Sequence, residues 1–168
     1  MLRTGLIIRV WLVVALLILG TSCAPSGAAI KVEPPGSAVQ VNDTVKVAIK
    51  IENVVNLTAV ELHLSFDPDM LEVLALNDGG FLKADFPVQN TYDNAAGTID
   101  YAVAQINHAP ANGSGRLLEI VFRVKAEGQA PIRFRGTQAA PAGVLLADPN
   151  GKAIPVALTG TSISVGQR

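Results

Sequence analysis

The chain has 168 residues, and its 13 lysines and arginines nearly balance its 14 aspartates and glutamates, giving a formal net charge of −1. This balance argues against nucleic acid as a partner, because binding phosphates requires a basic patch. The single cysteine, Cys23, excludes an intrachain disulfide, so the hydrophobic core alone must hold the fold.

A short apolar segment lies near the start of the chain. Residues 10–19 are apolar, Arg3 and Arg9 precede them, and Gly20-Thr21-Ser22-Cys23 follows. This order of basic, apolar and small residues before a cysteine is typical of a bacterial lipoprotein signal. We therefore expect residues 1–22 to be a cleaved signal peptide and Cys23 to carry a lipid. The protein would be exported and anchored to the cell membrane, facing outside, with residues 23–29 as a short tether.

Two alternatives for this junction remain open. One is an uncleaved membrane anchor, although the apolar run is shorter than the roughly 20 residues that a bilayer span needs. The other is an ordinary signal peptide with an incidental cysteine. Leu19 stands one place further from Cys23 than is usual before a lipidated cysteine, and Gly20 takes its place.

From residue 30 onward the pattern is almost purely β. Three stretches alternate apolar and mostly polar residues with a period of two, which predicts half-buried strands at 45–51, 59–66 and 118–125. Shorter candidate strands are 30–33, 70–76, 98–106, 132–134, 144–147, 153–156 and 162–165. Residues 81–97 are the least regular and are expected to form a long loop or a short helical turn. The remaining connections carry Gly, Pro, Asn and Asp turn signals.

About ten short strands at this spacing predict an all-β fold, a two-sheet β-sandwich occupying residues 30–166. Its core would be aliphatic. Its bulky members would be Phe66, Phe122, Phe134 and Tyr101.

No arrangement of catalytic or metal-binding residues emerges. His63 and His108 lack the spacing of metal ligands, and Gly113-Ser114-Gly115 is a turn rather than a nucleophile elbow. Asp67 and Asp69 flank a proline at the end of a predicted strand, where a structural turn is favoured over a pair of catalytic carboxylates. Residues 148–151 favour a hairpin turn over a calcium loop. We therefore expect a protein that is not an enzyme.

Six stretches, in order, resemble the cohesin domain family and together span nearly all of residues 31–165. They are NDTVKV at 42–47, IENV at 51–54, VELHLSFDPDMLEV at 60–73, GTIDYA at 97–102, LLEIVFRVKA at 117–126 and LADPNGKAI at 146–154. The resemblance implies a sandwich of about nine strands with jelly-roll topology. It also implies a partner, because cohesins bind dockerins, small calcium-loaded helical domains of other proteins. In cellulosomes this interaction docks polysaccharide-degrading enzymes at a scaffold or cell surface.

The resemblance further implies where a dockerin would bind. In the family it packs on one flat sheet face, which corresponds here to strands 59–66, 98–106 and 117–125. Ala59 departs from many dockerin-binding cohesins, which carry a hydrogen-bonding side chain there. No cofactor is implied for this chain, since the calcium would belong to the dockerin. The implied partner-binding residues are Glu61, His63, Ser65, Asp100, Ala102, Leu117, Glu119, Val121 and Arg123.

Three interpretations remain open besides dockerin binding. These outward residues are equally consistent with the solvated face of an ordinary sandwich. A polysaccharide-binding module on the same scaffold is a second alternative, although Trp11 lies in the signal segment and only Tyr92 and Tyr101 remain as tyrosines. A structural surface lipoprotein with an unrelated partner is the third.

Overall fold

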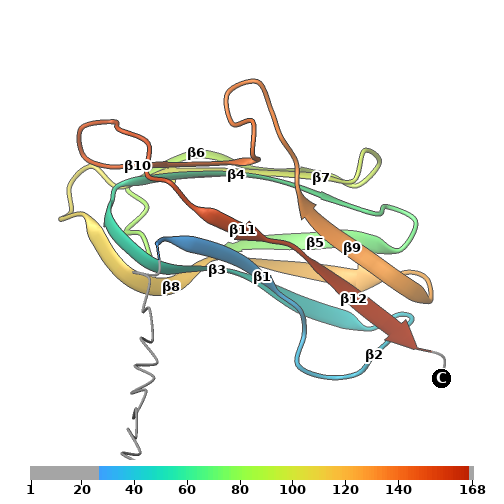
Figure 1. Cartoon of the computed structure of the whole chain (residues 1–168). Coiled ribbons are helices and arrows are strands. Elements are labelled where there is room, and N and C mark those ends of the chain that lie inside the picture. Colours follow the sequence, from blue (N-terminus) through green and yellow to red (C-terminus); the bar gives the residue numbers. More distant parts are fainter. Residues whose placement is uncertain (1–26, 167–168) are drawn as a thin grey trace, which may run out of the picture.

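Two curled β-sheets packed face to face make up the computed structural model, which describes residues 27–166 (Figure 1). One sheet has the order β11-β1-β3-β8-β5. The other has the order β2-β12-β9-β4-β7-β6, and β10 also pairs with β4. The predicted all-β, two-sheet sandwich is therefore confirmed. The expectation of about nine strands is wrong, since the described residues form twelve.

The strands of the five-stranded sheet are β11 (Ala157–Thr159), β1 (Ala29–Glu33), β3 (Thr44–Leu57), β8 (Ala111–Val124) and β5 (Leu71–Asp78). Those of the seven-stranded sheet are β2 (Val39–Gln40), β12 (Thr161–Gly166), β9 (Gly128–Phe134), β4 (Ala59–Phe66), β7 (Thr98–Ala104), β6 (Phe86–Asp93) and β10 (Val144–Ala147). In Figure 1, β4, β6, β7 and β10 form the upper layer, and β1, β3 and β8 lie in the lower one.

The core lies between the sheets and follows the period-two alternation. Because successive side chains of a strand point to opposite faces, strands β3, β4 and β8 bury about every second residue over much of their length. The buried residues of β3, β4 and β8 include Val47, Ile49, Leu62, Leu64, Ile120 and Phe122. The rings of Phe66 and Phe122 meet edge to face across the sandwich, with their centroids 5.4 Å apart. Phe66, Phe122 and Tyr101 are buried as predicted, whereas Phe134 is only partly buried.

Three of the predicted segments differ in the structure. Residues 113–115 were expected to form a turn but lie within strand β8, where they pair with β3. Residues 86–93 form strand β6 rather than a loop or helical turn. All eight of its residues are exposed, because β6 is an edge strand that pairs only with β7, and it therefore lacks the buried alternation that reveals a strand. Residues 153–156 are not a strand. Ala153 makes an isolated bridge with Ala147, and the following strand begins at Ala157.

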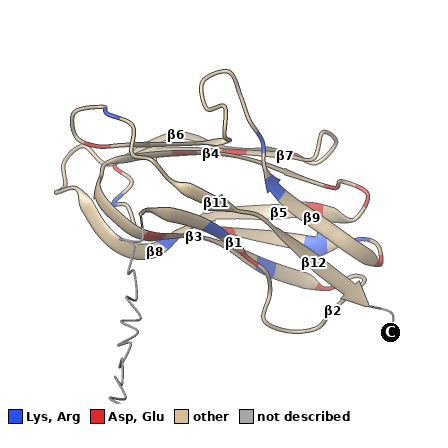
Figure 2. Ribbon diagram, viewed as in Figure 1, with Lys and Arg blue, Asp and Glu red and all other residues tan. Residues whose placement is uncertain are grey.

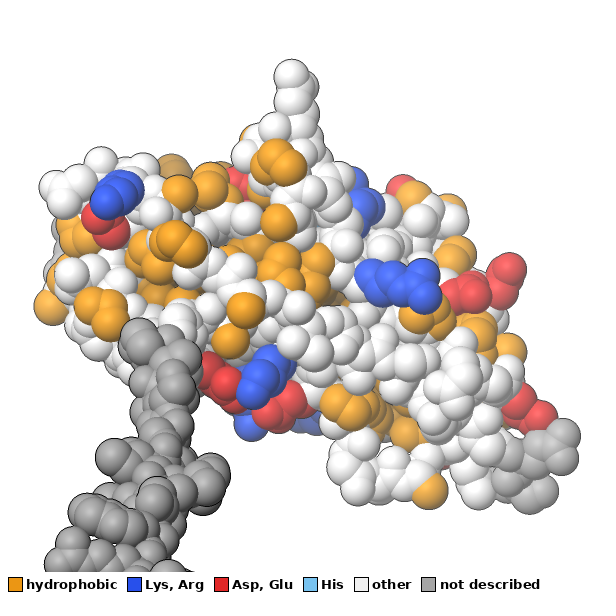
Figure 3. Space-filling view, in the orientation of Figure 1, with side chains coloured by type: hydrophobic (Ala, Val, Ile, Leu, Met, Phe, Trp, Pro, Cys, Tyr) orange, Lys and Arg blue, Asp and Glu red, His pale blue; other side chains and the backbone are white. Residues whose placement is uncertain are grey.

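Hydrophobic side chains also gather along one side of the sandwich, at the level of β10 and β11 (Figure 3). Partly buried Ile154, Val156 and Leu158 pack against the core there. The part of the chain that the structure describes contains no helix with the length and apolar character of a membrane span. The predicted signal peptide, residues 1–22, and Cys23 lie outside the described residues.

The aromatic contact across the sheets should carry a large share of the stability. We expect Phe122→Ala to lower the free energy of unfolding by about 3–5 kcal/mol, because it removes a fully buried ring and leaves a cavity. Val55 is 64% exposed, so Val55→Ala should change the free energy of unfolding by no more than about 0.5 kcal/mol. Urea unfolding followed by tyrosine fluorescence measures both. Equal effects of the two substitutions would contradict this placement of the core.

Candidate functional site

The antiparallel pairing of β4 with β7 arranges the outward side chains of the seven-stranded sheet in rows. Glu61 lies opposite Ala102, His63 opposite Asp100, and Ser65 opposite Thr98. Directly opposite residues have their Cβ atoms about 4.5–5.5 Å apart and share a face. The structure therefore brings five of the predicted partner-binding residues together on one surface: Glu61, His63, Ser65, Asp100 and Ala102.

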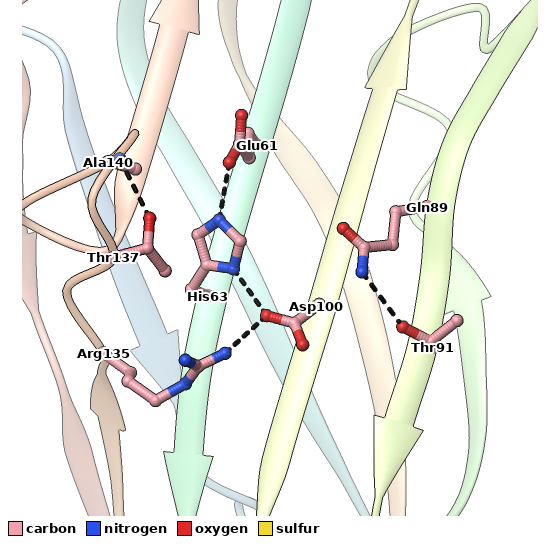
Figure 4. Close-up of polar contacts among 8 residues, drawn as sticks. All are labelled: Glu61, His63, Gln89, Thr91, Asp100, Arg135, Thr137 and Ala140. Atoms are coloured by element: carbon pink, nitrogen blue, oxygen red, sulfur yellow. Dashed lines mark hydrogen bonds and ion pairs between the residues drawn. The ribbon is translucent and has the colours of Figure 1, made fainter.

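A histidine held between two carboxylates occupies the centre of this surface (Figure 4). His63 Nδ1 lies 2.5 Å from Asp100 Oδ1, and its Nε2 lies 2.6 Å from Glu61 Oε1. Arg135 Nη2 donates to the same Asp100 oxygen at 2.6 Å. An ionised carboxylate only accepts hydrogen bonds, so both ring nitrogens of His63 must donate. With both carboxylates ionised, the geometry fits a doubly protonated imidazolium, and the two negative charges then balance those of His63 and Arg135.

The environment of His63 acts on its proton affinity in two directions. Burial by itself would lower the pKa of His63, whose side chain is 9% exposed. The hydrogen bonds from the ring to Asp100 and Glu61, together with the negative charges of these residues, outweigh burial and raise the pKa above its ordinary value. The cluster consequently favours the charged histidine on a face that is otherwise partly apolar.

An interruption in the neighbouring strand supplies Arg135. Strands β9 and β10 both pair with β4. Between these two strands, residues 135–143 leave the edge of β4 and form a loop that stands above the sheet (Figure 1). The loop begins where Arg135 N donates to His63 O and ends where His63 N donates to Gly143 O, both at 2.8 Å. Gly143 has a φ of +83°, and a Cβ there would lie 2.8 Å from Arg135 N. Only glycine therefore closes this loop without strain.

The outer face of the five-stranded sheet is different, because its charges pair with one another. In Figure 2, charged segments of both signs gather on β1, β3 and β8. Such exposed pairs contribute only about 0–1 kcal/mol each, but they leave few free charges for a partner. The pairs are Lys31–Glu52 and Lys50–Glu33 at 2.7 Å, Lys46–Glu119 at 3.0 Å, Arg116–Glu119 at 3.1 Å, and Arg123–Glu72.

The acidic residues near the turns have structural roles. Asp67 Oδ1 accepts from the Asp69 amide at 2.9 Å, and Asp148 Oδ1 accepts from the amides of Asn150 and Lys152 at 2.8 and 2.9 Å. The interpretation of both segments as turns is thus confirmed. Within residues 27–166, no three histidine, cysteine, aspartate or glutamate residues gather in a way that could hold a metal ion.

The sequence matches the model of the cohesin domain over residues 30–164. The chain belongs to the cohesin family. A curated relative, Cell surface glycoprotein 1 of Acetivibrio thermocellus, is 31% identical over 139 residues. The match covers 70% of this chain but only 6% of that protein, so the chain spans a small part of its relative's length.

Solved cohesins share the fold at low sequence identity. A type II cohesin from the cellulosome of Acetivibrio cellulolyticus superposes with a TM-score of 0.72 at 21% identity, covering 82% of this chain and 95% of that one. A non-cellulosomal cohesin from Archaeoglobus fulgidus gives 0.66 at 19%, with 84% and 92% covered. A chain of a type I cohesin–dockerin complex from Clostridium thermocellum gives 0.70 at 14%, with 84% and 100% covered.

Four residues expected on the same face of this cohesin domain lie elsewhere. The expectation that strand 117–125 shares a face with the other two is wrong, because β8 pairs with β3 and β5 in the opposite sheet. Glu119 and Arg123 belong to the ion pairs of that sheet, and Val121 lies half-buried between them. Leu117 is 2% exposed and belongs to the core cluster. A flat partner on β4 and β7 cannot contact these residues at the same time.

Sequence reasoning also missed parts of this surface. Arg135 follows the end of β9 and carries no periodic signal, so only the pairing of Arg135 N with His63 O reveals its position. Exposed Val88 and Leu145 lie on the two strands that flank β4 and β7. The alternation within residues 144–147 would have marked Leu145 as outward, but Val88 lies on β6, which was not predicted as a strand.

The histidine cluster should make the stability of this cohesin domain depend on pH. The folded-state pKa of His63 is raised, so its stabilisation is fully present below the ordinary value of about 6.5 and is lost as the pH rises through the folded value. Titration of the His63 ring by NMR should give a midpoint above about 6.5. Asp100→Asn should lower this midpoint, because it removes a negative charge and an acceptor. A wild-type midpoint below the ordinary value would contradict the imidazolium.

Proposed function

We propose that this cohesin domain is a non-catalytic docking module that binds a dockerin-bearing protein through the outer face of β4, β7 and β6. The observation that carries the proposal is the contrast between the two outer faces of the sandwich. On the five-stranded sheet the outward charges pair with one another. The outer face of β4, β7 and β6 instead combines the His63 cluster with exposed apolar side chains. The centres of protein interfaces carry few charged residues and much apolar area, which fits the second face better than the first.

The similar structures support a dockerin as the partner. Several are cohesin–dockerin complexes, among them one from Clostridium thermocellum and a type II cohesin–X-dockerin complex from Acetivibrio cellulolyticus. We propose Glu61, His63, Ser65, Asp100 and Ala102 as the central contact residues. The calcium of such a complex would belong to the dockerin, and the assembly would serve polysaccharide degradation.

The position of the domain outside the cell is part of the same proposal. The curated relative is a cell surface glycoprotein, and residues 1–23 have the pattern of a lipoprotein signal. A lipid on Cys23 would hold the docking face at the membrane, so that an enzyme carried by the partner is retained there.

Two opposed substitutions test which face binds. Dockerin modules encoded in the same genome are titrated calorimetrically into the protein, and we expect calcium-dependent binding that chelation abolishes. Ala102→Arg on β7 should weaken binding at least about tenfold, or about 1.4 kcal/mol, because it places a charge in the centre of the interface. Val121→Arg on β8 makes the same kind of change on the opposite face and should leave binding unchanged.

Three results would contradict this assignment. The first is that no dockerin of the genome binds, and the second is that Val121→Arg has the larger effect. The third is retardation by soluble polysaccharides in affinity electrophoresis without any binding to dockerins, which would favour a carbohydrate-binding module. Thermal unfolding of both variants checks that each one is folded.

Lipidation is tested separately from binding. Cys23→Ser removes the only thiol of the chain, so we expect the protein to leave the membrane fraction and to lose incorporation of labelled palmitate. Its affinity for a dockerin in solution should stay the same, since residues 30–166 are untouched. A variant that still sediments with membranes after a high-salt wash would contradict lipidation as the means of anchoring.

A further inference from the structure

The docking face is the outer face of β4, β7 and β6. At one end of it, alanine side chains form a flat floor. Ala59 lies opposite Ala104 in the pairing of β4 with β7, and Ala102 lies in the next row, opposite Glu61. On the other side of β4, Ala147 of β10 lies opposite Ala59. Four methyl side chains therefore form one patch that contains no hydrogen-bonding side chain.

Larger apolar side chains stand on both sides of this floor. Val88 of β6 is 62% exposed, and Leu145 of β10 is 39% exposed. Between them lies a hollow of about 130 Å³, which these two residues line together with the alanines. A second hollow of about 430 Å³ continues from it past Ile106, which is 70% exposed. Ala59, Ala104 and Ala147 line both hollows, so the two adjoin, and the first hollow, over the alanine floor, is the groove.

The size and lining of the first hollow select the group that fills it. An enclosed apolar cavity of about 150 Å³ takes up a benzene-sized molecule, so an open hollow of about 130 Å³ has room for one aliphatic side chain and little more. A hydroxyl or amide buried on the alanines would lose its water without gaining a hydrogen bond from their side chains. Such a loss costs roughly 1–3 kcal/mol in proteins.

A carboxylate marks one end of the groove. Glu61 lines the same hollow, and its side chain is 30% exposed. Its Oε1 accepts from His63, whereas its Oε2 has no hydrogen-bond partner within residues 27–166. Leu145 lies directly opposite Glu61 on β10, so the apolar wall and the carboxylate are immediate neighbours. A partner that fills the groove therefore brings its next side chain beside the Glu61 carboxylate, whose Oε2 remains available as an acceptor.

We propose that this groove receives one aliphatic side chain, of leucine or isoleucine size, from the docked partner, and that a neighbouring lysine or arginine of that partner binds Glu61. The inference rests on the proposed function, since the partner is the dockerin of that proposal. It goes beyond that function by naming what the face selects, which is an apolar residue next to a cation.

The first experiment tests the groove without a dockerin. The free protein is titrated with 3-methylbutan-1-ol, which resembles a leucine side chain, and the alanine methyl resonances are followed by NMR. We expect saturable shifts of Ala59, Ala102, Ala104 and Ala147. Ala104→Leu fills the groove and should abolish them, whereas Ala48→Leu, an outward position on β3 in the opposite sheet, should leave them intact. Shifts that are absent, or that survive Ala104→Leu, would overturn the proposal.

The second experiment uses the dockerin that binds in the calorimetric titration. Ala104→Leu should weaken it at least about tenfold, while Ala48→Leu should bind like the wild type. Glu61→Gln should weaken binding and reduce its dependence on salt, because it removes one charge contact. A dockerin that binds Ala104→Leu as tightly as the wild type overturns the groove but leaves the docking function standing. If no dockerin binds, the proposed function fails, and the alcohol titration alone decides whether the groove is an aliphatic site.

Discussion

The in-register pairing of β4 with β7 is the constraint on which the rest of the molecule depends. The same alternation that places Leu62 and Leu64 in the core turns Glu61 and His63 outward. A shift of one residue would exchange the two faces, burying the histidine between the sheets and exposing leucines to water. The register also places His63 directly opposite Asp100, within reach of a short hydrogen bond. Core and candidate binding surface are thus two consequences of one pairing.

The two outer faces of the sandwich use their charges differently. On β1, β3, β5 and β8, lysines and arginines pair with glutamates on neighbouring strands, so covering this face would remove water from many ions at once. Removing water from an ion pair costs more than the pair itself regains unless new partners are well placed. On β4 and β7 the charged groups are concentrated in one cluster around His63, and alanines occupy the rows beside it. This face is therefore the less costly one to cover.

An interrupted edge strand completes the surface. Strands β9 and β10 run along the same side of β4, and the loop of residues 135–143 separates them. The beginning of that loop brings Arg135 to Asp100, and its end starts the strand that carries Leu145. One local departure from regular pairing thus supplies both the second cation of the cluster and one wall of the apolar groove. Gly143, with its positive φ, permits the chain to rejoin the edge of β4 at the start of β10.

The sequence by itself determined the fold class and much of the core, because period-two alternation is a local signal that each strand carries alone. It also marked Glu61, His63, Ser65, Asp100 and Ala102 as outward residues, which the family resemblance then assigned to partner binding. It did not reveal β6, whose eight exposed residues lack alternation, nor Arg135, whose position depends on pairing far along the chain. Only the tertiary structure decided which strands share a sheet. Alternation shows that a side chain points outward but not on which of two opposite faces, and so it could not separate β8 from β4 and β7.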